Sequence, residues 1–176
     1  MIDPVFYWII SIILAMLWCR AAINKLQASQ EFAQLFAAYH LFPQSLAPSM
    51  AMILPCVELL VAVLLLLPAR QIEGALASAA LLSIYAMAMA LNLLRGRNHI
   101  DCGCHFGSSQ TISWLLVTRN MVLACLSLIL LLPLVTRLLS GGDILLIGTF
   151  CFVIGLSGMM LQALSNLRSA AMRAEQ

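Results

Sequence analysis

The amino-acid sequence predicts an all-α fold: a polytopic transmembrane helix bundle of four to five spans with one interfacial amphipathic helix. Hydrophobic residues make up 63% of the 176 residues, charged residues make up 9%, and the mean hydropathy is +1.02. These values lie outside the range of ordinary soluble domains. The formal net charge of +2 is too small to indicate nucleic-acid binding. We therefore expect one integral membrane domain over residues 1–176, with the lipid bilayer around it.

Five apolar runs are each long enough to cross a hydrocarbon core of about 30 Å, which takes about 20 helical residues. In lipid only helices and closed barrels satisfy their own backbone, and continuous apolar runs are not barrel strands. No cleavable signal peptide is expected, because the first run starts at Pro4 without a basic segment before it. The spans are expected at residues 4–23, 49–67, 74–94, 114–135 and 143–164.

The segment 24–48 is too short and too polar to cross, and its pattern predicts an amphipathic helix lying in the membrane interface. Pro43 and Pro48 close this helix before the second span. Its polar face is expected to carry Gln30, Glu31 and Gln34. Its large apolar side chains follow helical spacing, and they are Phe32, Leu35, Phe36 and Tyr39.

Two ionisable residues are predicted inside spans, where such groups are costly and face the bundle interior. Glu58 lies about ten residues into the second span, after Pro55, and Arg119 lies in the fourth span. Both are expected at similar depth in the same half of the membrane, so we predict that they pair. The pair would either fix the register of the bundle or handle protons. The third span is predicted to be central, because small residues that allow close helix approach line it: Gly74, Ser78, Ser83, Ala86 and Ala90.

The basic residues are distributed unequally between the two sides of the predicted bundle. With five spans, the segment 24–48, the loop 95–113 and the C-terminal tail share one side. The positive-inside rule therefore predicts that this side is cytoplasmic, in a bacterial inner membrane. The shared side carries Arg20, Lys25, Arg95, Arg97, Arg168 and Arg173, and the opposite side carries Arg70 and Arg137.

The loop 95–113 gathers most of the reactive side chains of the chain. Cys102 and Cys104 are one residue apart, and Gly103 gives the backbone the freedom that a small Cys-x-Cys ring needs. A strained, exposed disulfide of this kind is readily reduced, which is typical of catalytic thiol–disulfide pairs. The neighbouring cations favour a thiolate, whereas Asp101 opposes it. Those cations are Arg95, Arg97, His99 and His105.

Two other interpretations of the loop stay open. His99, Cys102, Cys104 and His105 are ligands that zinc or copper would accept, although four ligands from so short a stretch rarely reach tetrahedral geometry. Alternatively, the loop is structural and its cysteines are incidental. The remaining cysteines are expected to act as small apolar residues within the spans, and they are Cys19, Cys56, Cys125 and Cys151.

Several motifs resemble the methylamine utilisation protein MauE family, which is allied to the DoxX-like membrane proteins. The resemblance covers about residues 20–135, and Asp101-Cys-Gly-Cys104 is its most specific part. His105 departs from the pattern, because the family's Phe is expected directly after the second cysteine. The other matching motifs are Lys25-Leu26, Tyr39 with Pro43, Leu54-Pro55 with Glu58, Arg95-Gly-Arg97, Phe106-Gly107, Trp114 and Arg119-Asn120.

The resemblance implies an accessory membrane protein for maturation of methylamine dehydrogenase or a related quinoprotein amine dehydrogenase. It implies disulfide formation in the dehydrogenase small subunit, together with a thioredoxin-like partner of the MauD type. The quinone cofactor of that enzyme is made from its own tryptophans, so no cofactor is expected in this chain. A noncatalytic membrane anchor or assembly factor and a metal-handling membrane protein are the alternative functions.

The charge bias conflicts with the implied function, since disulfides of an exported enzyme form outside the cytoplasm. Either the chain carries electrons outward from a cytoplasmic thioredoxin, or its topology is inverted and a membrane quinone accepts the electrons. Within the pair we predict that Cys104 attacks the partner, because Asp101 lies beside Cys102.

Overall fold

The computed structural model describes residues 3–39, 43–97, 112–133, 135 and 140–174, and over these residues it is helical apart from short connections. The all-α helix bundle predicted from the sequence is therefore confirmed. The helices are α1 (Pro4–Gln27), α2 (Ser29–Ala38), the 3-10 turn η1 (Gln44–Leu46), α3 (Ala47–Leu66), α4 (Gln71–Leu94), α5 (Trp114–Ile129) and α6 (Gly141–Ala174).

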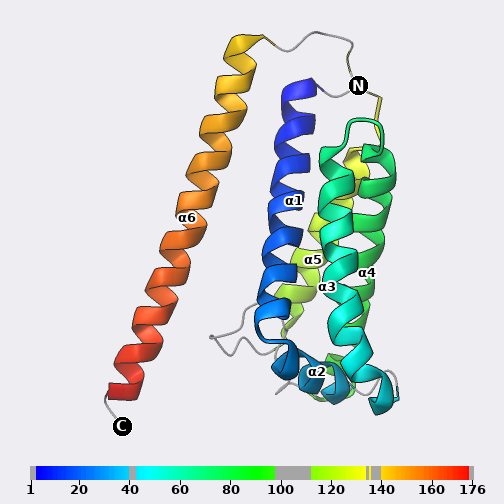
Figure 1. Ribbon diagram of the computed structural model, residues 1–176, viewed down its shortest axis with the longest axis vertical. Coiled ribbons are helices and arrows are strands. Elements are labelled where there is room, and N and C mark those ends of the chain that lie inside the picture. The colour runs from blue at the N-terminus through cyan, green and yellow to red at the C-terminus, as the bar shows by residue number, and fades with distance from the viewer. Residues whose placement is uncertain (1–2, 40–42, 98–111, 134, 136–139, 175–176) are drawn as a thin grey trace.

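Four helices, α1, α3, α4 and α5, run alternately up and down and form the body of the bundle (Figure 1). Helix α3 packs against α1 and α4, and α4 packs in turn against α5. The short helix α2 lies across one end of the bundle, against the first turns of α3 (Figure 1). Helix α6 contacts α1. The end of α4, the start of α5 and α2 thus lie at the same end of the molecule.

The interior of the bundle is apolar, and large side chains fill its centre. Trp18 and Leu14 of α1, Leu65 of α3 and Leu82 of α4 are almost completely buried. The outer faces are apolar as well, as Phe6, Leu60, Leu115 and Val122 illustrate with more than half of their surface exposed. Contiguous exposed apolar surface of this extent marks a membrane or partner contact. The bundle is therefore that of a membrane protein.

Helix α4 approaches α3 most closely at Gly74. A Cβ atom added there would lie 2.7 Å from the backbone nitrogen of Leu65 and 2.8 Å from the carbonyl carbon of Leu64. Only glycine fits at this distance without a shift of the backbone. Ser78 and Ala86 of the same predicted face are buried too, whereas Ser83 is exposed. The central position predicted for the third span agrees with the packing of α4 against both α3 and α5.

The span limits differ from the predicted ones mainly in the second half of the chain. Among the residues that the structure describes, three helical stretches are long and apolar enough to cross a membrane: α1, η1 with α3, and α4. Helix α5 has 16 residues and ends at Ile129, short of the predicted 135, and Pro133 follows its last turns. Proline has no N–H to donate to the carbonyl four residues earlier, which here is that of Ile129, and its ring clashes with that carbonyl, which explains the early end. Helix α6 continues to Ala174, beyond the predicted 164.

Candidate functional site

The predicted redox pair lies in a segment that the structure does not describe. Cys102 and Cys104 fall within residues 98–111, and so do His99, Asp101 and His105. The redox interpretation and its metal-binding alternative therefore stay predictions. The structure does describe the two ends of the segment, where the chain leaves α4 and where it enters α5. Arg95 and Arg97, the predicted supporting cations, are exposed at the first of these ends.

Helix α4 ends in a Schellman motif centred on Gly96. The N–H of Gly96 donates to the carbonyl of Leu93, and the N–H of Arg97 donates to the carbonyl of Asn92, both at 3.0 Å. Gly96 has a φ of 72°, a conformation that costs glycine little and other residues more. The direction in which the chain leaves α4 is thus fixed by hydrogen bonds five residues before Cys102.

The chain re-enters the bundle at Ile112, which is 3% exposed. Ile112 packs with Met89 of α4 and Leu116 of α5, and Tyr39 lies beside this cluster. The carbonyl of Ser113 then accepts the N–H of Leu116 at 3.0 Å, which starts α5. Both ends of the cysteine segment are consequently attached to the same end of the bundle.

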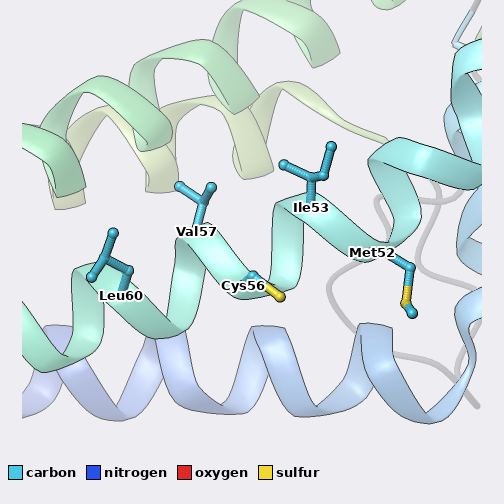
Figure 2. Close-up of a pocket in the computed structure, with 5 residues that line it drawn as sticks. All are labelled: Met52, Ile53, Cys56, Val57 and Leu60. Carbon is cyan, nitrogen blue, oxygen red and sulfur yellow. The ribbon is translucent and has the colours of Figure 1, made fainter.

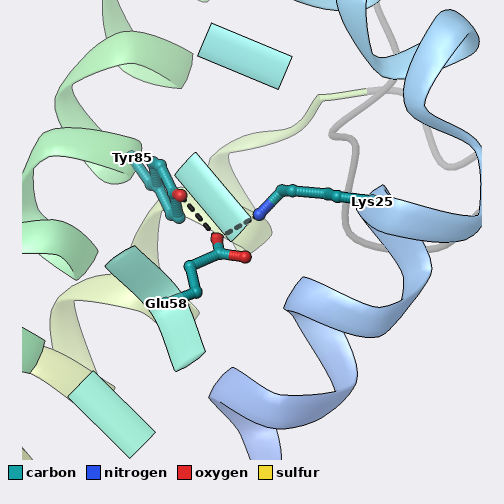
Figure 3. Close-up of polar contacts among 3 residues, drawn as sticks. All are labelled: Lys25, Glu58 and Tyr85. Carbon is teal, nitrogen blue, oxygen red and sulfur yellow. Dashed lines mark hydrogen bonds and ion pairs between the residues drawn. The ribbon is translucent and has the colours of Figure 1, made fainter. Parts of the chain in front are cut away.

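A cluster of ionisable side chains is buried within the bundle near that end. Glu58 of α3 forms an ion pair with Lys25 of α1, and their side chains are 0% and 5% exposed. The hydroxyl of Tyr85 on α4 donates to Glu58 Oε1 at 2.5 Å, so three helices meet at one carboxylate (Figure 3). A buried pair of this kind offsets much of the cost of placing each charge in the interior.

Helix α2 covers this cluster through Phe32, which is 5% exposed. The Lys25 Nζ lies 5.4 Å from the centre of the Phe32 ring and 5.0 Å from the centre of the Tyr85 ring. Both distances are within the range of cation–π attraction. The amphipathic pattern predicted for this segment is confirmed, because Gln30, Glu31 and Gln34 are exposed while Phe32 is buried.

The predicted pair of Glu58 with Arg119 is wrong. Lys25 is the cation at Glu58, and Arg119 lies on an exposed position of α5. Helix α5 packs mainly against α4, and Tyr85 of α4 contacts Glu58. The prediction placed the two residues at similar depth but had no information on which helices are neighbours.

A second polar group joins three helices next to the ion pair. Trp18 Nε1 donates to Ser78 Oγ at 2.9 Å, and the Ser78 and Ser127 hydroxyls are hydrogen-bonded at 3.0 Å. These side chains come from α1, α4 and α5, and all three are buried. The Trp18 and Tyr85 rings lie 6.0 Å apart between their centres, so this group adjoins the ion-pair cluster. Neither group was predicted from the sequence.

The four described cysteines are free thiols. Cys56 lies in an apolar groove on the outer face of α3 (Figure 2), and Cys125 is exposed on α5. Cys19 and Cys151 lie on α1 and α6 and are partly buried. The described part of the chain therefore holds no disulfide. The groove is lined by Met52, Ile53, Cys56, Val57 and Leu60.

Comparison with known proteins assigns the chain to a family. The family model described as methylamine utilisation protein MauE matches residues 3–134. The methylamine utilization protein MauE of Paracoccus denitrificans is 39% identical over 175 residues, which cover 97% of this chain and 94% of that protein. The MauE of Paracoccus versutus is 40% identical over 127 residues, which cover 72% of this chain and 68% of that protein. No solved structure matches the chain. The chain belongs to the MauE family of membrane proteins, which is involved in methylamine utilisation.

Proposed function

We propose that this protein is an inner-membrane accessory factor for maturation of methylamine dehydrogenase or a related amine dehydrogenase. In this proposal Cys102 and Cys104 form the thiol–disulfide pair that drives disulfide formation in the dehydrogenase small subunit, through a thioredoxin-like partner. The observation that carries the proposal is the Asp101-Cys-Gly-Cys104 sequence in a chain of the MauE family. Support comes from the two described ends of the segment, which are attached at one end of the bundle.

The exchange takes place between the sulfur atoms of Cys102 and Cys104 and two thiols of the partner. In the direction of partner oxidation, a thiolate of the partner attacks Cys104 of the oxidised pair, and the Cys102 sulfur leaves as a thiolate. The second partner thiolate then attacks the mixed disulfide and releases Cys104. The attack of Cys104 on an oxidised partner, predicted above, is the reverse of this second step. The partner is thereby oxidised by two electrons, and the Cys102–Cys104 pair is reduced by two. A membrane quinone, the proposed class of oxidant, then takes the two electrons and two protons from the pair and becomes a quinol, while the Cys102–Cys104 disulfide forms again.

Single C102S and C104S variants test the proposal. Each should trap a mixed disulfide with a thioredoxin-like protein, visible as a band that a reductant abolishes. Each should also lower the amount of active, disulfide-bonded dehydrogenase in cells grown on methylamine. C56S and C125S are matched controls, because both thiols are exposed on outer helix faces. If C102S and C104S support dehydrogenase maturation as well as the controls do, the redox function is wrong. In that case a noncatalytic anchor is the better interpretation.

A further inference from the structure

We propose that water molecules are bound inside the bundle, in the half that lies toward the cysteine segment. The proposal rests on a polar column, a row of polar side chains along the bundle interior, and it does not depend on the chemistry of Cys102 and Cys104. Every buried polar or charged side chain that the structure describes belongs to this column or contacts it. Those side chains are Ser11, Lys25, Glu58, Gln71, Ser78, Asn92, Asn120 and Ser127.

The polar column follows from a seven-residue repeat in three helices. Seven residues make almost two full turns of an α-helix, so residues at this interval share one face. From Gln71 to Asn92 the repeat extends about 30 Å along α4, which is the thickness of a hydrocarbon core. The repeat comprises Ser11, Trp18 and Lys25 in α1, Gln71, Ser78, Tyr85 and Asn92 in α4, and Asn120 and Ser127 in α5.

Hydrogen bonds align the three repeats with one another. Ser78 of α4 is bonded to Trp18 of α1 and to Ser127 of α5, so these three side chains lie at one level of the bundle. Helices α1 and α4 run in the same direction, and α5 runs in the opposite direction (Figure 1). The next level toward the cysteine segment, seven residues along each helix, therefore consists of Lys25, Tyr85 and Asn120.

Three buried polar atoms in this half of the column have no hydrogen-bond partner among the described residues. They are Glu58 Oε2, Asn120 Nδ2 and Asn92 Oδ1. Glu58 belongs to the level of Asn120, because its Oε1 is bonded to Lys25 and Tyr85. A buried polar atom without a partner is costly. The three atoms are one donor and two acceptors, and bound water, which both donates and accepts, can satisfy all of them.

The Trp18–Ser78–Ser127 group closes this half of the column. Its indole N–H and its hydroxyls are bonded to one another, and none of its buried polar atoms lacks a partner. The buried leucines of the core pack in the same cluster as Trp18. The two other unpartnered atoms of the column, Ser11 Oγ and Gln71 Nε2, lie beyond this group. Water bound toward the cysteine segment is therefore separated from the opposite half of the column.

Radiolytic footprinting of the full-length protein in lipid nanodiscs tests the proposal. An X-ray pulse converts water to hydroxyl radicals, which oxidise side chains beside bound water even where bulk solvent is excluded, and mass spectrometry locates the oxidised residues. Met89 is the reporter, because it is 3% exposed and lies one turn before Asn92 on α4. Met121 follows Asn120 on α5 but faces the lipid with 46% of its surface exposed, so it is the matched control. Met89 should be oxidised several-fold faster than Met121.

N120L provides the second measurement, because leucine is similar in size to asparagine but has no hydrogen-bonding group in its side chain. This variant should lower the oxidation rate of Met89 to that of Met121, whereas T118L, which changes an exposed residue of α5, should leave the rate high. N92L serves the same purpose if N120L does not fold, and the wild-type comparison decides if neither variant folds.

Two results would overturn the proposal. In the first, Met89 of the wild type is oxidised no faster than Met121. In the second, Met89 is oxidised faster, but a folded N120L or N92L variant does not slow the reaction. The polar column would then only set the register of the helices, as single buried polar residues do in coiled coils.

Discussion

Replacement of Lys25 by methionine should destabilise the bundle severely. Methionine is unbranched and similar in length to lysine, so K25M removes the charge while largely filling the same space. Among the described residues, Glu58 then keeps one donor, the Tyr85 hydroxyl at 2.5 Å, and its Oε2 has none. A fully buried carboxylate would remain without a counter-charge, because the described cations other than Lys25 do not contact it.

The size of the effect follows from the burial of both partners, which are 5% and 0% exposed. Removal of one partner from a buried ion pair costs about 3–5 kcal/mol, whereas replacement of both by apolar residues is often neutral or stabilising. For a chain of this length about 1 kcal/mol corresponds to roughly 2–4 °C in Tm. K25M should therefore lower Tm by roughly 6–20 °C, and the double variant K25M/E58M should recover most of this loss.

Thermal unfolding of detergent-solubilised protein, followed by circular dichroism, measures the effect. R70M is the matched control, because it breaks the Arg70–Glu73 pair, whose side chains are 60% and 55% exposed. Exposed ion pairs contribute little to stability, so R70M should have the same Tm as the wild type. If K25M has the same Tm as R70M and the wild type, or if K25M/E58M is no more stable than K25M, the buried ion pair does not stabilise the bundle as we argue.

Three further predictions follow from other contacts. G74A should cost about 1–3 kcal/mol, because its Cβ would lie 2.7 Å from the α3 backbone, whereas G148A, with no atom within 4 Å, should be tolerated; urea or thermal unfolding distinguishes them. S78A should cost about 1–3 kcal/mol, because it leaves the buried indole N–H of Trp18 without an acceptor, and the same unfolding assay measures this loss. Labelling of Cys104 with an impermeant thiol reagent tests the topology: the positive-inside assignment predicts labelling only in permeabilised cells, whereas the proposed electron transfer to a membrane quinone needs the loop outside and predicts labelling of intact cells.

The positions of the helices were predictable from the sequence because apolar run length is a direct physical requirement of the bilayer. The first three spans begin and end within a few residues of α1, α3 and α4. The ends of α5 and α6 were less predictable, because the apolar composition of this region continues past Pro133. A proline within an apolar run allows either a kink or an end, and only the folded chain distinguishes the two.

The partner of Glu58 was missed although the sequence contains a signal for it. Ser11, Leu14, Trp18 and Lys25 lie on the buried face of α1, at successive intervals of three, four and seven residues. A lysine in the last turn of a span is normally read as an interfacial anchor, because its long side chain can reach water. The spacing of Lys25 along α1 instead places it on the buried face. The pairing could have been predicted only by giving this spacing more weight than the location of Lys25 near the end of the helix.

Tyr85 and the Trp18–Ser78–Ser127 group could not be predicted, because their contacts depend on which helices are neighbours. Depth in the membrane can be counted along a span, whereas helix neighbours are set by packing of the whole bundle. Glu58 and Arg119 illustrate the difference, since their similar predicted depth led to a pair that the packing of α4 precludes.

The ion pair between α1 and α3 also bears on how the protein is inserted into the membrane. A single charged residue near the centre of a helix opposes insertion by about 2.5–3.5 kcal/mol. Glu58 lies eleven residues into α3 and meets its counter-charge only when α1 is already beside it. Lys25 lies near the end of α1, so its side chain can reach the membrane interface before α3 inserts. Insertion of α3 is therefore tied to its association with α1, so that a chain whose first helix is displaced or deleted should fail at biogenesis before any step of redox chemistry.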